Sequence, residues 1–85
     1  HDEYRIDYLR RHFRQAQLAL SDGVDLIGYC PWSFLDLVST HQGYGKRYGF
    51  VYVNREEKDL KDMARIKKDS FYWYHNVIQT NGKEM

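Results

Sequence analysis

Hydrophobic residues near the start of the chain recur at alternating three- and four-residue steps. This spacing places them on one stripe, and arginines occupy the other face. It predicts an amphipathic helix from Asp2 to Ser21, with acidic residues at its positive end. Gly23 can adopt the left-handed conformation that ends a helix. The expected buried stripe is Ile6, Leu9, Phe13, Ala16 and Leu20.

The pattern changes after Gly23. Val24 to Tyr29 is almost continuously apolar, which is typical of a strand buried on both faces of a parallel sheet. Pro31 should end regular pairing there. Asp36 to Arg47 reads as a loop, and the alternation from Tyr48 to Asn54 predicts a short strand after it.

A second helix follows a charged, exposed turn. Asp69 or Ser70 is a suitable N-cap, and Asn81-Gly82 is a suitable end. The residues expected on its buried stripe are Phe71, Tyr74 and Ile78.

Helix, buried strand, loop and helix make an α/β unit that lacks partners. A lone strand cannot satisfy its hydrogen bonds or bury both of its faces. We therefore interpret residues 1–85 as part of one domain and not as a complete domain. The rest of the sheet would come from further chain or from other copies of this one.

Composition narrows the class of function. The 85 residues contain 13 Lys and Arg against 12 Asp and Glu, which leaves a net charge of +1. This balance argues against nucleic-acid binding and against a membrane-surface role. No apolar run reaches the roughly 18 to 20 residues of a membrane span. A single cysteine, Cys30, is consistent with a reducing cytoplasm.

Three polar residues in the predicted loop suggest a binding site. Ser39, Lys46 and Tyr48 supply a hydroxyl, an ammonium and a phenol, which together suit a phosphate dianion. Gly43 and Gly45 would let backbone N–H groups approach the same anion. Ordinary loop residues could form the same pattern by chance.

The remaining polar residues indicate neither a metal site nor a cofactor, and no hydrolytic motif is present. His12 and His75 fall on the predicted helices, where a surface role is expected. His41 lies in the loop and could contact a ligand.

Three blocks of sequence carry a resemblance: YCPWSFLD at 29–36, GYGKRYGFVYV at 43–53 and KDSFYWY at 68–74. They resemble the C-terminal end of family-one glycoside hydrolases, and more narrowly the bacterial 6-phospho-β-glucosidases. The resemblance implies a (β/α)8 TIM barrel, of which this chain would supply the last helix–strand–loop–helix portion.

The resemblance also assigns roles to the central stretch. Trp32 matches the tryptophan that stacks under the sugar, and Ser39, Lys46 and Tyr48 match the family's phosphate ligands. Ordinary β-glucosidases carry a glutamate at the position of Ser39, and a carboxylate would repel a phosphate there. Thr40 favours a gluco over a galacto substrate.

By the same resemblance, two catalytic glutamates belong to motifs upstream of His1. The parent enzyme would hydrolyse 6-phospho-β-glucosides to glucose 6-phosphate with retention. This chain alone would be inactive. The alternative is a small non-catalytic module that binds a sugar phosphate or another anion. A single-stranded nucleic-acid binder is disfavoured by the balanced charge.

Overall fold

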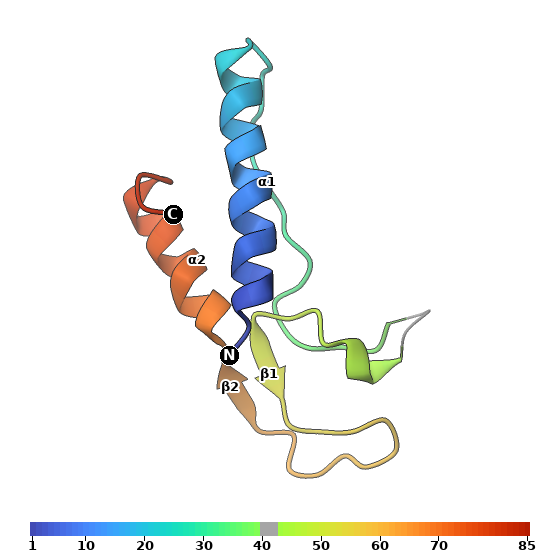
Figure 1. The fold of residues 1–85 in the computed structure, drawn as a ribbon. Coiled ribbons are helices and arrows are strands. Elements are labelled where there is room, and N and C mark those ends of the chain that lie inside the picture. Colours follow the sequence, from blue (N-terminus) through green and yellow to red (C-terminus); the bar gives the residue numbers. More distant parts are fainter. Residues whose placement is uncertain (40–42) are drawn as a thin grey trace.

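A computed structural model describes residues 1–39 and 43–85. The elements are helix α1 (Glu3–Ser21), a 3-10 turn η1 (Tyr44–Lys46), strands β1 (Val51–Val53) and β2 (Arg65–Lys67), and helix α2 (Asp69–Thr80). The two helices lie side by side, and the two-stranded hairpin extends from one end of the pair (Figure 1). The molecule is elongated, with extents of 48 × 26 × 19 Å.

Helix α1 confirms the first predicted helix, and Gly23 confirms its end with φ at 93°. The predicted stripe is buried only in part. Ile6 and Leu9 are buried, whereas Leu20 remains 51% exposed. Because α1 continues beyond the end of α2, its last turns have no helix to pack against (Figure 1).

The predicted N-cap of α2 is wrong. Lys68 is the N-cap and its side chain makes no capping hydrogen bond, while Asp69 is the first helical residue. The cap comes instead from the start of the chain: Asp2 accepts a hydrogen bond from Ser70 N at 2.9 Å and another from the Ser70 hydroxyl. Asn81, with φ at 54°, confirms the predicted end of the helix.

The predicted buried stripe of α2 is also partly wrong. Ser70 and Val77 are the buried residues, Phe71 and Tyr74 are half-buried, and Ile78 is 61% exposed. The helix packs on α1 and lies near β2, so its remaining face is open to solvent.

The expected strand from Val24 to Tyr29 does not form. This segment runs back along α1 in an extended conformation (Figure 1), but no ladder hydrogen bond pairs it with a strand in the described part of the chain. Ile27 is 96% exposed. The physical reason is the one anticipated: a strand with two apolar faces needs neighbours on both edges.

The expected strand at Tyr48–Asn54 is confirmed in part, because only Val51–Val53 form β1, the centre of a small pairing network. β1 pairs antiparallel with β2, so that Tyr52 lies opposite Ile66. On its other side an isolated parallel bridge joins Leu35 to Val51. β2 was not predicted, because its three residues are all exposed and show no apolar alternation.

Neither helix in the described ranges is long and apolar enough to cross a membrane.

Candidate functional site

A hollow of about 760 Å³ opens between α1, the extended segment and the loop before β1. Three of the four predicted binding residues line it. Trp32 is 72% exposed, Lys46 is exposed, and Tyr48 is half-buried. The other lining residues include Tyr4, Arg5, Tyr8, Arg11, Tyr29 and Phe50. An exposed indole, an ammonium and a phenol around one hollow suit a ligand with an apolar ring face and an anionic group.

Trp32 and Tyr48 are brought together by backbone pairing. Ser33, the residue after Trp32, donates from its N–H to the carbonyl of Tyr48 at 3.3 Å. Phe50 N returns a hydrogen bond to the carbonyl of Ser33 at 3.1 Å. Two segments that are 15 positions apart in sequence (33 to 48) are therefore held side by side at the hollow. The sequence alone did not predict this parallel pairing.

Ser39 is placed differently from the other three. It is not among the described residues that line the hollow. Its backbone forms a two-hydrogen-bond bridge with Gly43, with N···O distances of 2.9 and 3.1 Å, which closes the base of the loop. Gly43 has φ at 70°, a conformation that glycine adopts without a Cβ penalty. The expectations for Thr40 and His41 fall outside the described residues.

The expected backbone anion cradle is already occupied. Gly43 N donates to the carbonyl of Ser39, and Gly45 N donates to a carboxylate oxygen of Glu57 at 3.0 Å. A Cβ added at Gly43 would lie 2.4 Å from the same Glu57 oxygen. The loop thus does present an N–H to an anion, but in this structure the anion is Glu57. Nothing in the sequence pattern pointed to that glutamate.

Arg47 separates Lys46 from Tyr48 and is held by its side chain. Its guanidinium donates to the carbonyl of Val53 at 2.9 Å and to that of Arg55 at 2.6 Å. It also lies over the ring of Tyr52, 4.4 Å from the ring centroid. These contacts draw the guanidinium toward β1 and the chain after it, and Arg47 is not among the described residues that line the hollow.

The backbone of Arg47 is held as well. Its φ is 53°, which is uncommon for a residue other than glycine. Its carbonyl accepts hydrogen bonds from the guanidinium of Arg5 and, at 3.4 Å, from Lys68 Nζ. Arg5 is in turn held by Asp2 at 2.7 Å. Helix α1 and the residue before α2 therefore contribute to fixing the loop at the point between Lys46 and Tyr48.

Asp36 connects the loop, β1 and the start of α2. Its side chain is fully buried and pairs with Lys68 at 2.8 Å and with Arg47 at 3.4 Å. It also accepts hydrogen bonds from Gly49 N at 3.0 Å and Val53 N at 3.3 Å. Burial lowers the pKa of Lys68, and Arg5 adds to this, although the hydrogen bond that Lys68 donates to Asp36 opposes the shift. In the sequence, Asp36 stands out only as an acidic residue directly after the largely apolar block at 29–35. That position does not reveal that Asp36 connects three elements.

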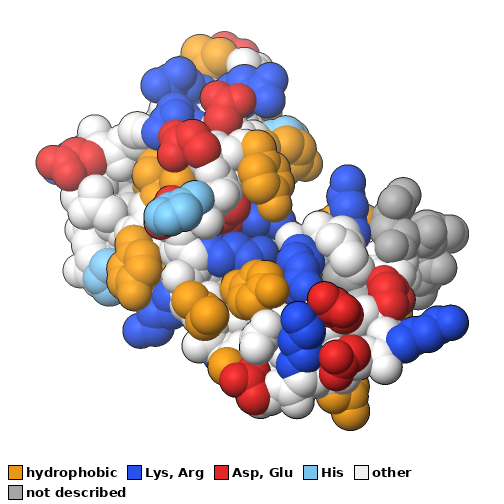
Figure 2. All heavy atoms as spheres, turned by 60° about the horizontal axis from the view of Figure 1, so that its bottom comes forward, with side chains coloured by type: hydrophobic (Ala, Val, Ile, Leu, Met, Phe, Trp, Pro, Cys, Tyr) orange, Lys and Arg blue, Asp and Glu red, His pale blue; other side chains and the backbone are white. Residues whose placement is uncertain are grey.

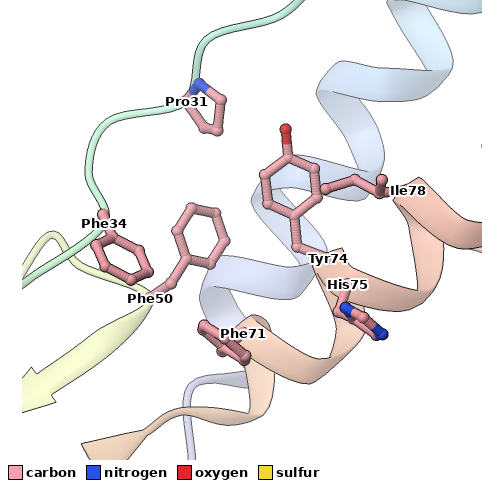
Figure 3. A pocket seen from close by; sticks show the side chains of 7 residues that line it. All are labelled: Pro31, Phe34, Phe50, Phe71, Tyr74, His75 and Ile78. Atoms are coloured by element: carbon pink, nitrogen blue, oxygen red, sulfur yellow. The ribbon is translucent and has the colours of Figure 1, made fainter. Parts of the chain in front are cut away.

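A second hollow, of about 300 Å³, is apolar. It lies between the extended segment and α2 and is surrounded by side-chain rings, those of Pro31, Phe34, Phe50, Phe71 and Tyr74 (Figure 3). Its described lining contains no lysine or arginine. It therefore does not suit a phosphate.

Charges elsewhere are mixed. On the face shown in Figure 2, acidic and basic side chains are interspersed around the hairpin and the loop. Within the described ranges, no three His, Cys, Asp or Glu side chains are grouped so that they could hold a metal ion.

Comparison with known proteins decides the family. The model of glycosyl hydrolase family 1 matches residues 1–83. The chain belongs to glycosyl hydrolase family 1. This confirms the resemblance, and with it the expectation that the chain is a portion of a TIM barrel.

The chain is similar both to family members named as phospho-β-glucosidases and to family members named as β-glucosidases. The aryl-phospho-β-D-glucosidase BglC of Bacillus subtilis is 64% identical over 84 residues, which are 99% of this chain and 18% of that protein. The 6-phospho-β-glucosidase AscB of Escherichia coli is 46% identical over 99% of this chain and 18% of its own length. β-Glucosidase A of Thermotoga maritima is 50% identical over the same shares. The chain thus spans about a fifth of these family members.

A solved structure supports the same family fold. The family 1 β-glucosidase from Thermotoga maritima superimposes with a TM-score of 0.87 at 50% identity, covering 99% of this chain and 18% of that one. At this level of agreement the chain as a whole follows the backbone path of the corresponding part of that enzyme.

Proposed function

We propose that the chain is the substrate-phosphate end of a 6-phospho-β-glucosidase. In this proposal Trp32 stacks on the sugar ring, and Ser39, Lys46 and Tyr48 bind the 6-phosphate. The whole enzyme hydrolyses 6-phospho-β-glucosides to glucose 6-phosphate with retention of configuration.

The observation that carries this proposal is the shared hollow. Lys46 and Tyr48 line the same hollow as Trp32, and Ser39 lies at the base of the same loop. The 6-phosphate is attached through an oxygen to C6, the exocyclic carbon next to the sugar ring, so its ligands must lie near the surface that stacks on that ring. An ammonium and a phenol are both donors, and both are compatible with a dianion.

The relatives support the phosphorylated class without deciding it. BglC and AscB are named as enzymes of phosphorylated glucosides, but the β-glucosidase of Thermotoga maritima is also 50% identical. Overall identity therefore does not separate the two substrates. In this proposal the residues of the loop distinguish the phosphorylated from the plain glucoside, and Lys46 is the position to test.

We further propose that the two catalytic carboxylates are supplied by parts of the enzyme outside this chain. The same missing barrel would provide the strands that pair with 24–30. The exposure of Ile27 and the unpaired backbone around it weigh against the alternative of a small module that folds by itself.

The test is the full-length protein with Lys46→Ala, compared with Lys83→Ala, an exposed lysine near the C-terminus. Loss of a charge-assisted contact costs about 1.5–3 kcal/mol, so we expect kcat/KM for the phosphorylated glucoside, relative to the plain one, to fall about 10- to 150-fold. The Lys83 variant should keep the original ratio. A Lys46→Ala enzyme with unchanged preference would contradict the proposal.

A further inference from the structure

We propose that Arg47 is a positioning residue for the substrate phosphate, although it is not among the described residues that line the hollow. The inference rests on the proposed function, because it concerns how Lys46 and Tyr48 are held. Arg47 is the only residue between these two, so its conformation sets the relative orientation of both side chains.

The side chain of Arg47 works as an anchor on the far side of the loop. The planar guanidinium presents donors in a fixed fork. Here that fork reaches the carbonyls of Val53 and Arg55 at 2.9 and 2.6 Å and the carboxylate of Asp36 at 3.4 Å. The face of Tyr52 supports it at 4.4 Å. A lysine has the same charge but a single ammonium, and it cannot span these acceptors together.

The anchor is needed because the backbone there is in an uncommon conformation. Arg47 has φ at 53°, and such residues persist when their surroundings over-determine them. Two cations, Arg5 and Lys68, hold its carbonyl, which belongs to the peptide plane leading into Tyr48. Releasing the guanidinium would let Arg47 relax toward ordinary backbone angles. Lys46 and Tyr48 would then no longer point into the same hollow.

Arg47→Lys in the full-length protein tests this, with Arg65→Lys as the matched control. Arg65 lies on β2, is exposed, and its guanidinium donates a hydrogen bond to the carbonyl of the nearby Met63. We expect Arg47→Lys to lower the phosphorylated-to-plain ratio of kcat/KM about 10- to 100-fold, mainly through KM of the phosphorylated substrate. For the plain glucoside, which has no phosphate to orient, we expect a clearly smaller loss in kcat/KM than for the phosphorylated one. Arg65→Lys should leave kcat/KM unchanged for both substrates.

A double variant separates positioning from a direct contact. If Arg47 acts through Lys46 and Tyr48, Arg47→Lys should have a smaller effect once Lys46 is alanine, because only the part exerted through Tyr48 remains, so the two losses should not fully multiply. Multiplicative losses would overturn the inference. So would equal losses on both substrates, because these indicate a general structural role.

Tyr52→Leu gives a second measurement that does not depend on the folding of Arg47→Lys. It removes only the ring beneath the guanidinium, and we expect the ratio to fall about 2- to 5-fold. If Lys46→Ala lowers the ratio while Arg47→Lys and Tyr52→Leu do not, the proposed function stands and this inference is wrong. If Lys46→Ala itself has no effect, both are wrong.

Discussion

The carboxylate of Asp36 accepts a hydrogen bond from Lys68 Nζ at 2.8 Å, and both side chains are buried, with exposures of 0% and 8%. The bond joins the start of the loop to the residue that precedes α2. The same carboxylate also accepts hydrogen bonds from the backbone N–H groups of Gly49 and Val53. The side chain of Asp36 therefore connects the loop, the sheet and the start of the helix.

Removing that charge should be costly. Asp36→Asn leaves the ammonium of Lys68 buried without its counter-ion, and breaking a buried pair in this way costs about 3–5 kcal/mol. We expect a loss of this size in the free energy of unfolding, measured by urea denaturation of the full-length protein. The control is Asp7→Asn, which breaks an exposed pair with Arg11 and should cost less than about 1 kcal/mol. Equal losses in the two variants would contradict this account of Asp36.

Asp2 should contribute to stability through its hydrogen bonds to α2. Its carboxylate is buried and accepts hydrogen bonds from Ser70 N, from the Ser70 hydroxyl and from Arg5. Asp2→Ala leaves these donors without a partner, so we expect a loss of about 2–4 kcal/mol in the free energy of unfolding. Asp2→Asn keeps one carbonyl acceptor and should lose less. An alanine variant as stable as the original protein would show that the contacts do not matter.

The same carboxyl should give stability a dependence on acid. Burial alone would raise the pKa of Asp2, but the hydrogen bonds from Ser70 and Arg5 outweigh it and hold the pKa below 3.8. Because the pKa of this carboxyl is lower in the folded protein than in the unfolded chain, its ionised form stabilises the folded state at pH values above the unfolded pKa. This contribution is lost as the pH falls through 3.8 and below. Urea midpoints measured over this range should fall less steeply in Asp2→Asn. An identical slope in both proteins would argue against the assignment.

Gly49 is required by a close approach of two backbone segments. A Cβ at this position would lie 2.3 Å from both Asp36 N and Leu35 C, and backbone atoms cannot move aside as a flexible side chain can. We expect Gly49→Ala to destabilise the protein by about 1–3 kcal/mol. Gly45→Ala is the control, because its Cβ would meet nothing within 4 Å. Thermal unfolding of both variants checks this, and a larger loss at Gly45 would contradict it.

Glu57 should weaken the binding of a phosphate by this loop. Its carboxylate accepts the Gly45 N–H, next to Lys46, and a like charge there disfavours a second anion. We expect Glu57→Gln to lower KM for the phosphorylated glucoside about 2- to 5-fold at low salt and less at high salt. Glu84→Gln, near the C-terminus, serves as control. A higher KM in Glu57→Gln would show that the carboxylate supports the loop instead.

Local patterns were sufficient for the elements that depend on local interactions. The apolar spacing predicted α1, and Asn81-Gly82 predicted the end of α2. The burial of each helix could not be predicted this way: Ile78 follows the helical period, yet it is 61% exposed. Periodicity shows which residues share a face, but the burial of that face depends on the elements packed against it.

The sequence by itself determined the helices, the loop, the family resemblance and the candidate residues Trp32, Ser39, Lys46 and Tyr48. Only the tertiary structure decided how they are held. The hydrogen bond between Ser33 and Tyr48 joins residues 15 positions apart, and the ion pair between Asp36 and Lys68 joins residues 32 apart. The cap that Asp2 provides for Ser70 spans 68 positions. Such contacts depend on the path of the whole chain, and no local pattern of residues encodes that path.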